Sequence, residues 1–363
     1  MNMYADERHK AILRQVQRHG SARVRELAAE LGASTATIRK DVEVLAQRGL
    51  VVRVHGGALL PEDWSETRPS SAPVAGSDTP SPGRRLTFGM VVPSATYYYP
   101  ELIKGVQEAA AARGVRLALR VSEYAAEQER EQARQLVEGG ADGLLLAPTD
   151  TDPGALRQWY EDLGVPVVLV ERRQARESAS VEHVVTDHVF GARRAVEHLV
   201  EVGRRRIALL VRGHSPTVPW LKEGYATGMR EAGLHVPDDV SFIDLGREWH
   251  GNPGYDRPME TFLDAVADKR VNAVIVHPDT EALVLLQRLR ARSLSVPSDL
   301  AIVSYDDEIA GIADTPLSAV APAKYDVGVS AVELLGLRLA EPSRARRRTF
   351  ILPELHVRFS SDL

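Results

Sequence analysis

Residues 7–58 decide the first part of the fold, and their sequence is ERHKAILRQVQRHGSARVRELAAELGASTATIRKDVEVLAQRGLVVRVHGGA. Apolar side chains recur at helical spacing over 7–18, 24–31 and 34–48, and a glycine follows each of these stretches. Residues 50–60 then hold two short apolar runs around a Gly-Gly pair. The pattern predicts three helices followed by a β-hairpin.

The second and third predicted helices are joined by the tight turn Gly32-Ala33, and we expect the hydroxyl of Ser34 to cap the third helix. Two helices joined in this way form a helix-turn-helix, whose second helix enters the major groove of DNA. The outward residues near the start of that helix are Thr35, Ala36, Thr37, Arg39 and Lys40. The hydroxyls allow close approach to DNA, and the two cations suit phosphate or guanine contacts. A three-helix protein-interaction domain is the alternative that the pattern leaves open.

Charge and composition divide the chain after this module. The protein has 363 residues and a net charge of −5, yet residues 1–60 hold ten Lys and Arg against six Asp and Glu. A basic end on an acidic body favours a polyanionic partner for that end, although a solvated helical face gives the same pattern. Pro, Ser and Gly make up 11 of the 19 residues in 65–83, as in a linker. We therefore expect a DNA-binding domain at 1–60, a linker at 61–85 and a body at 86–363.

The body alternates short apolar runs with helical patterns. The runs lie at 86–92, 117–121, 143–147, 167–170, 207–211, 273–276 and 301–305, and the helical stretches include 101–113, 127–138, 189–202, 221–232 and 280–292. Apolar runs separated by helices indicate parallel strands in βαβ units, and a body of this length fits two lobes better than one. The predicted fold class is α/β: an N-terminal winged helix-turn-helix, a linker and two parallel-sheet lobes.

The segments that follow the predicted strands hold the candidate ligand-binding residues, because open parallel sheets bind ligands beyond the carboxyl ends of their strands. Aromatic rings can cover the C–H face of a polyhydroxylated ligand while charged groups orient its hydroxyls. These candidates are Tyr98, Tyr99, Asp150, Arg172, Asp187, Trp220, Asp279 and Asp306. The competing interpretation for Asp187, Asp279 and Asp306 is a helix cap. The tyrosine run at 97–99 has the alternative of packing between lobes.

Several functional classes are excluded by what the sequence lacks. It contains no cysteine, which removes disulfides, zinc–thiolate sites and cysteine nucleophiles. No apolar run reaches the roughly 18 residues of a membrane span. The charged N-terminus has no signal-peptide core, so we expect a cytoplasmic protein without a membrane partner. The motifs GxxxxGK[ST], GxGxxG, GxSxG and HExxH are absent, and no histidines pair at metal-ligand spacing, so no catalytic residue, cofactor or metal is expected.

Residues 7–58 resemble the winged helix-turn-helix of DeoR-type regulators. The shared motifs are Glu7-Arg8 with Ile12-Leu13, Glu26-Leu27-Ala28, Ser34-x-x-Thr37-Ile38-Arg39-Lys40-Asp41, Leu45, Gly49 and His55-Gly56-Gly57-Ala58. The resemblance implies that the DNA contacts come from Ser34, Thr35, Thr37, Arg39, Lys40 and His55. The resemblance also implies a structural role for Asp41, which is expected to pair with a neighbouring arginine. Lys40 stands where the family more usually has arginine, which keeps the charge but loses the bidentate guanidinium.

The body resembles the effector domain of the lactose-repressor (LacI/GalR) family over residues 86–360. The matching motifs are ELIxG at 101–105, ADGL at 141–144, VPVV at 165–168, DxxxGxxxAxxHL at 187–199, GRxxIA at 203–208, GY at 224–225, VPxDLA at 296–301, VSYDD at 303–307 and TPL at 315–317. The resemblance implies a bilobal fold like that of periplasmic binding proteins, a homodimer, and a small effector, usually a sugar or nucleobase, between the lobes. The match places Asp187, Asp279 and the 97–99 region at that cleft.

The chain departs from the LacI/GalR pattern in two places. The family commonly has an arginine three residues before the Gly-aromatic pair, whereas this chain has Leu221 there, and Arg172 or Arg247 is the candidate replacement. The linker lacks the pattern of the hinge helix that family members insert into the minor groove. The body also does not resemble the sugar-phosphate effector domain that normally accompanies a DeoR-type module. The chain therefore resembles a chimera of the two families.

These observations predict a transcriptional repressor of carbohydrate uptake or catabolism genes, controlled by a sugar bound between the lobes. A homodimer would place two DNA-binding modules on a pseudo-palindromic operator. The alternatives are a regulator that responds to a non-sugar metabolite, a soluble ligand-binding protein without a DNA role, and an enzyme with a DNA-binding appendage. The sequence leaves open which effector binds, which operator is recognised, and whether the effector releases or recruits DNA binding.

Overall fold

The computed structural model describes residues 8–9, 11–13, 15–16, 21–47, 51–54, 57–59, 85–149, 153–173, 181–235, 238–248 and 250–362. Almost all of the predicted linker, the predicted end of the first helix near Gly20, and the candidate site residues His55 and Asp150 lie outside these residues.

The N-terminal module is built around two helices and a small sheet. Its elements are β1 (Ser21–Arg23), α2 (Val24–Glu30), α3 (Thr35–Gln47), β2 (Val52–Val54) and β3 (Gly57–Leu59). The predicted hairpin is confirmed, because β2 and β3 pair antiparallel, and β1 joins β3 as a strand that the sequence analysis did not predict. Ile12, Leu27 and Ile38 are almost completely buried, so the apolar faces of the helices meet in a core.

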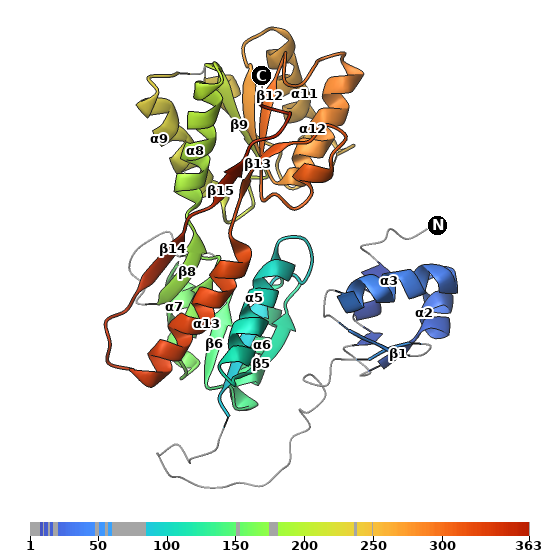
Figure 1. Ribbon diagram of the computed structural model, residues 1–363, viewed down its shortest axis with the longest axis vertical. Helices are drawn as coiled ribbons and strands as arrows, with labels where there is room; N and C mark the ends of the chain where they lie inside the picture. The colour runs from blue at the N-terminus through green and yellow to red at the C-terminus, as the bar shows by residue number, and fades with distance from the viewer. Residues whose placement is uncertain are drawn as a thin grey trace.

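The first lobe of the body is a parallel sheet between two layers of helices (Figure 1). Among the described residues the strand order is β14-β8-β7-β6-β4-β5. The strands are β4 (Thr87–Val92), β5 (Arg116–Val121), β6 (Gly143–Leu146), β7 (Val167–Val170), β8 (Glu182–Thr186) and β14 (Arg348–Ile351), and the helices are α5 (Tyr99–Ala112), α6 (Ala126–Glu138), α7 (Pro153–Asp162) and α13 (Lys324–Ala340). Leu145 belongs to the core beneath α5 and α13, whereas Leu144 and Leu146 belong to the core on the side of α6 and α7.

The second lobe repeats this architecture with one antiparallel edge strand. Among the described residues its order is β10-β9-β11-β12-β13-β15, in which only β15 runs antiparallel to its neighbour. The strands are β9 (Ile207–Val211), β10 (Phe242–Asp244), β11 (Ala273–His277), β12 (Ala301–Tyr305), β13 (Ser318–Ala321) and β15 (Glu354–His356). The helices are α8 (His188–Glu201), α9 (Val218–Glu231), α10 (Asp238–Ser241), α11 (Pro253–Ala267) and α12 (Asp279–Ala291), with a 3₁₀ turn, η1, at Ala310–Ile312.

The chain crosses between the two lobes at three places in the described part of the body (Figure 1). It passes from β8 to α8, from β13 to α13, and from β14 to β15. The lobes are therefore not consecutive halves of the sequence, since the last strands return to both sheets. This topology confirms the predicted bilobal α/β class.

The predicted strands and helices of the body are confirmed within about three residues at each end. The strands β8, β10, β13, β14 and β15 and the helices α7, α11 and α13 were not among the predicted elements. Several of these strands lie at or next to a sheet edge, where polar residues interrupt the apolar pattern. Their pairing is set by distant parts of the chain, as when Thr349 of β14 lies opposite Val184 of β8.

Helices α5 and α13 of the first lobe pack with unusually close backbones. A Cβ on Gly105 would lie 2.2 Å from the carbonyl oxygen of Tyr325, and a Cβ on Gly328 would lie 2.3 Å from the carbonyl oxygen of Leu102. The obstructing atoms are backbone atoms, which cannot rotate away as side chains do. Glycine at these two positions therefore sets the distance between the helices.

We expect Gly328→Ala to lower the free energy of unfolding of the full chain by about 1–3 kcal/mol, because overpacking forces the two helices apart. Urea denaturation measures the effect. Gly336→Ala is the matched control on the same helix, since no atom lies within 4 Å of its added Cβ. That control should gain about 0.5–1 kcal/mol from the better helix propensity of alanine. Equal effects of the two changes would contradict the packing argument.

Candidate functional site

The start of α3 presents the predicted DNA-contacting residues at the surface. Thr35, Arg39 and Lys40 are exposed, and neither cation forms an ion pair with any described residue. Ser34 caps the helix as predicted, because its Oγ accepts a hydrogen bond from the backbone N–H of Thr37 at 3.0 Å. The Oγ1 of Thr37 lies 2.8 Å from the same oxygen, and this residue is half-buried. The helix therefore offers two positive charges at its exposed face.

Asp41 has the structural role that was predicted for it. The Nε of Arg8 donates to one of its carboxylate oxygens at 2.8 Å, and the Nε2 of His9 lies 3.1 Å from the other. Asp41 is buried, so these contacts tie the first helix to α3. The pairing fixes the orientation of the helix that carries the exposed cations.

A hydrogen bond joins the two lobes at the ends of their sheets. The hydroxyl of Tyr97, which follows β4, donates to Oδ2 of Asp306, which follows β12, at 3.3 Å. Asp306 is only 4% exposed. Its burial and the nearby carboxylate of Asp279 raise the pKa of Asp306 well above its ordinary value. The structure thus places Asp306, one of the candidate ligand-binding residues, at the boundary between the lobes.

A second cluster surrounds Glu171, which follows β7 and was not among the predicted site residues. Its Oε1 accepts hydrogen bonds from the hydroxyls of Tyr98 at 3.0 Å and Thr186 at 2.7 Å. The Nε2 of His188 lies 3.6 Å from its other oxygen. Burial alone would raise the pKa of Glu171, but the nearby His188 and the hydrogen bonds from Thr186 hold it below the ordinary value. Glu171 is therefore an anchored carboxylate beside the chain crossing from β8 to α8.

Arg172 lies next to this carboxylate and contacts a predicted tyrosine. One guanidinium nitrogen donates to the hydroxyl of Tyr99 at 3.0 Å, and another donates to the carbonyl of Glu171 at 2.7 Å. Its Nε is buried and has no hydrogen-bond partner among the residues that the structure describes. The structure brings the predicted residues Tyr98, Tyr99 and Arg172 together through these contacts.

The residues around Arg172 line a pocket between the lobes. Its lining consists of Glu171, Arg172, Arg173, Val185, Thr186, His188, Pro216, Thr217 and Trp220, and its volume with the open mouth is about 290 Å³. Glu171, Arg172, Arg173, Val185 and Thr186 belong to the first lobe, whereas Pro216 and Thr217 lead into α9 of the second and Trp220 lies in the first turn of α9. The guanidinium of Arg173 lies 3.4 Å from the ring centre of Trp220. Aromatic and charged groups from both lobes thus converge on one space.

Two predicted residues act as structural anchors. The Oδ1 of Asp187 accepts from the backbone N–H of Phe190 at 2.9 Å, which confirms the helix-cap interpretation for this residue. Asp279 begins α12, but its carboxylate instead binds the hydroxyl of Ser304 at 2.6 Å and the backbone N–H groups of Glu308 and Ile309. A capping role for Asp279 is therefore wrong. The same holds for Asp306, which lies in a loop that precedes no regular helix.

Leu221, at the position where the family commonly has arginine, lies in the core. Leu221 is fully buried and packs among the apolar residues of the second lobe. Arg247, one predicted replacement, is exposed and does not line the pocket described above. Its carbonyl instead accepts a hydrogen bond from Arg212, which also lies 3.6 Å from Glu281. Arg172 is therefore the predicted replacement that reaches the pocket.

His277 is a further buried group at this boundary that sequence analysis did not single out. It ends β11, is 6% exposed, and its Nε2 lies 3.8 Å from Oδ2 of Asp306. Its Nδ1 is buried without a hydrogen-bond partner. Burial, assisted by the neighbouring His188 and Arg172, lowers the pKa of His277 to about 3. The ring is therefore neutral at pH 7.

In the part of the chain that the structure describes, no group of three or more His, Asp or Glu side chains is arranged to hold a metal ion. No described helix combines the length and apolarity that crossing a bilayer requires.

A helix-turn-helix with exposed cations, joined to a two-lobed α/β body with a pocket between its lobes, defines a ligand-regulated DNA-binding protein. Comparison with known proteins agrees with this class. Residues 8–63 match the DeoR-like helix-turn-helix domain, and residues 196–361 match the periplasmic binding protein-like domain.

Transcriptional repressors are among the relatives of this chain. The ribose operon repressor of Escherichia coli is 28% identical over 278 residues, which cover 76% of this chain and 82% of the relative. The arabinose metabolism transcriptional repressor of Geobacillus stearothermophilus is 25% identical over 345 residues, covering 93% and 90%. The structure of a LacI-family regulator from Sanguibacter keddieii is 30% identical, covers 77% of this chain and 99% of its own, and superposes with a TM-score of 0.62. The chain belongs to the LacI family of transcriptional regulators and carries a DeoR-like DNA-binding domain.

The buried His277 predicts a pH dependence of stability. Because its folded-state pKa of about 3 lies below the ordinary value of 6.5, the unfolded chain binds the proton first as the pH falls. Its contribution to stability is complete above pH 6.5 and declines progressively from there toward pH 3, by up to about 1.4 kcal/mol per pH unit.

We expect His277→Gln to flatten the slope of unfolding free energy against pH between pH 7 and pH 5, measured by urea denaturation. His235→Gln, which changes an exposed histidine, is the control and should leave the slope unchanged. A slope in His277→Gln equal to that of the wild type would show that His277 does not titrate as this burial requires.

Proposed function

We propose that this protein represses genes of carbohydrate uptake or catabolism, and that a sugar bound between the two lobes controls its binding to operator DNA. The observation that carries the proposal is the pocket lined from both lobes, in a chain that also holds an exposed basic helix-turn-helix. The names of two relatives, a ribose operon repressor and an arabinose metabolism repressor, support a sugar as the effector.

The chemistry of the cleft supports a polyhydroxylated effector. Trp220 provides a flat apolar face in the pocket, and Glu171 and Arg172 provide groups that orient hydroxyls. We propose that Tyr98, Tyr99 and Asp306 contribute to the same site. We propose that Asp150, Asp187, Arg247 and Asp279 border the same cleft, where Asp187 and Asp279 shape it through the loops they hold. A metabolite with an acid group is the second candidate, because Arg172 and Arg173 both line the pocket.

The DNA contacts follow from the exposed start of α3. We propose that Ser34, Thr35, Thr37, Arg39, Lys40 and His55 face the operator, in a domain that ends near residue 60. The body from residue 86 dimerises and, through the linker at 61–85, holds two such domains over a pseudo-palindromic site. The proposed place of action is the cytoplasm.

Control of DNA binding requires that the sugar site between the lobes and the DNA-binding helix be thermodynamically coupled. A sugar shifts the balance between two lobe arrangements only by its difference in affinity for them, and that difference is the largest effect it can have on operator binding. The contact between Tyr97 and Asp306 joins the lobes at this boundary. A ligand hydroxyl that takes the place of the Tyr97 hydroxyl on Asp306 would change how the lobes are held.

We expect Arg39→Ala to weaken operator binding by about 1–3 kcal/mol if the guanidinium contacts a base, and to lower the salt dependence by about one unit if it contacts a phosphate. The measurement is a gel-shift titration on a duplex that the wild-type protein selects from a random library. Arg134→Ala removes an exposed arginine from α6 of the body and is the control. Unchanged affinity and salt dependence in Arg39→Ala would remove this residue from the interface.

We expect a thermal-shift screen with D-ribose, L-arabinose and cellobiose to find a sugar that stabilises the wild-type protein. A ligand at 100 times its dissociation constant adds about 2.7 kcal/mol. Asp306→Ala should weaken binding of that sugar at least tenfold, because a hydrogen bond to a charged or strongly polar group is lost. Asp314→Ala is the control in an exposed loop of the same lobe. Full sugar binding by Asp306→Ala would contradict the assignment of the cleft.

A further inference from the structure

The loop after β12 has an unusual backbone at the boundary between the lobes. Asp306 and Asp307 are consecutive residues with positive φ angles, 102° and 54°. Residues other than glycine adopt this region rarely and at an energetic cost, so the surrounding contacts must hold the pair in place. The side chains of Asp306 and Asp307 contact different residues.

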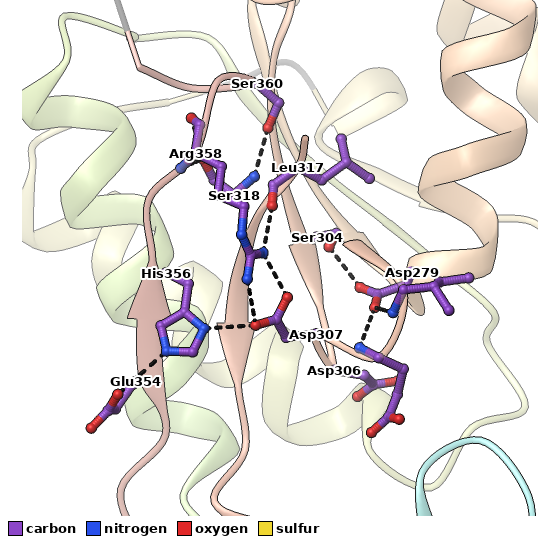
Figure 2. A network of polar contacts seen from close by, with 12 residues as sticks. Asp279, Ser304, Asp306, Asp307, Leu317, Ser318, Glu354, His356, Arg358 and Ser360 are labelled. Carbon is purple, nitrogen blue, oxygen red and sulfur yellow. Dashed lines mark hydrogen bonds and ion pairs between the residues drawn. The ribbon is translucent and has the colours of Figure 1, made fainter. Parts of the chain in front are cut away.

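Asp306 and Asp307 point to opposite sides of this loop. Asp306 is bound by Tyr97 at the lobe boundary. Asp307 is bound by the C-terminal segment, as Figure 2 shows. The guanidinium of Arg358 donates to its two carboxylate oxygens at 2.6 and 2.9 Å, and the Nδ1 of His356 lies 2.6 Å from one of them.

The charge on Asp307 strengthens these contacts. Burial opposes ionisation, but the hydrogen bonds from Arg358 and His356 hold the pKa of Asp307 below its ordinary value. The carboxylate is therefore ionised at pH 7, and its bidentate contact with the guanidinium is of the strong, charge-assisted kind. The contact fixes the direction of the Asp307 side chain as well as its position.

Arg358 is itself held by the sheet of the second lobe. Its guanidinium also donates to the carbonyl of Leu317 at 2.8 Å, and its backbone N–H donates to the hydroxyl of Ser318 at 2.8 Å. The strand before it, β15, pairs with β13, where His356 lies opposite Ala319. The C-terminal segment is therefore a fixed support on which Asp307 is fastened.

The other side of the loop has an independent anchor. Asp279 accepts hydrogen bonds from the backbone N–H groups of Glu308 and Ile309 (Figure 2). Removal of the Arg358 side chain leaves this anchor intact. The change is thus expected to loosen Asp306 and Asp307, with the bond from Nζ of Lys324 to the carbonyl oxygen of Asp306 still in place, without releasing the residues that follow them.

We propose that Arg358 and His356 are positioning residues for effector binding, which hold Asp306 in the cleft by fastening Asp307 on the opposite side of the loop. Neither residue lines the pocket described above. The inference rests on the proposed function in one respect, the role of Asp306 in sugar binding. It makes the C-terminal segment, which crosses from β14 to β15 between the lobes, a determinant of sugar affinity.

The first arm of the test needs no ligand. Hydrogen–deuterium exchange of the full-length protein measures the backbone amide of Asp306, which donates to the carbonyl of Val320 at 3.0 Å. In Arg358→Ala we expect this amide to exchange at least tenfold faster, while amides of β11 and α12 keep their wild-type rates. Arg358→Lys, which keeps the charge, should recover part of the protection. The control is Arg290→Ala, an exposed arginine of the same lobe that pairs with Asp314.

The second arm measures sugar binding by calorimetry, with whichever of D-ribose, L-arabinose or cellobiose stabilises the wild-type protein. Arg358→Ala should bind at least tenfold more weakly, Arg358→Lys should fall between it and the wild type, and Arg290→Ala should bind normally. If Arg358→Ala does not fold, His356→Ala replaces it, since that half-exposed side chain is a milder loss, and a smaller change in the same direction is expected.

The two arms separate the two proposals. Unchanged exchange at Asp306, or faster exchange across the whole lobe, would overturn the positioning role. Wild-type sugar affinity in Arg358→Ala would overturn it as well. If none of the three sugars binds the wild-type protein, the sugar proposal loses its support, and the exchange experiment alone still decides whether Arg358 holds Asp306.

Discussion

The hydrogen bond between Tyr97 and Asp306 is the contact on which the account of this molecule depends, because it joins the carboxyl ends of two separate sheets. The three chain crossings bring those ends together, so residues after β7 share a pocket with residues at the start of α9. A cleft built in this way can be opened or closed by a small relative movement of the lobes. A ligand that replaces a contact across it acts on the arrangement of the whole body, which is what a regulator of DNA binding requires.

Much of the fold could be predicted from the sequence, because the signals were local. Continuous apolar runs identified the central strands, and the Ser34 cap and the role of Asp41 followed from short motifs. The edge strands were missed because their pairing depends on distant residues. The same limit applies to the site: the sequence indicated Tyr98, Arg172 and Trp220, but the contact of Asp307 with Arg358, 51 residues away, has no signature in spacing.

The departures from the family pattern have physical consequences in the structure. Leu221 packs in the core of the second lobe, and the two arginines that line the pocket, Arg172 and Arg173, come from the first lobe. The cleft thereby combines a buried guanidinium, a stacked arginine on Trp220 and an anchored carboxylate at Glu171. The positive charges in this pocket therefore lie at different positions from the one that the family pattern implies. How a ligand contacts Arg172 and Arg173 determines which effector binds.

The most direct test of the central claim measures operator affinity with and without the effector on the same protein. Fluorescence anisotropy with the selected duplex would be recorded in the absence of sugar and at a saturating concentration of the sugar found by thermal shift. The account predicts a change in DNA affinity of at least fivefold, in line with the usual range of coupling between sites, and the loss of that change in Asp306→Ala. Identical DNA affinity at zero and saturating sugar would contradict the claim that the cleft controls DNA binding.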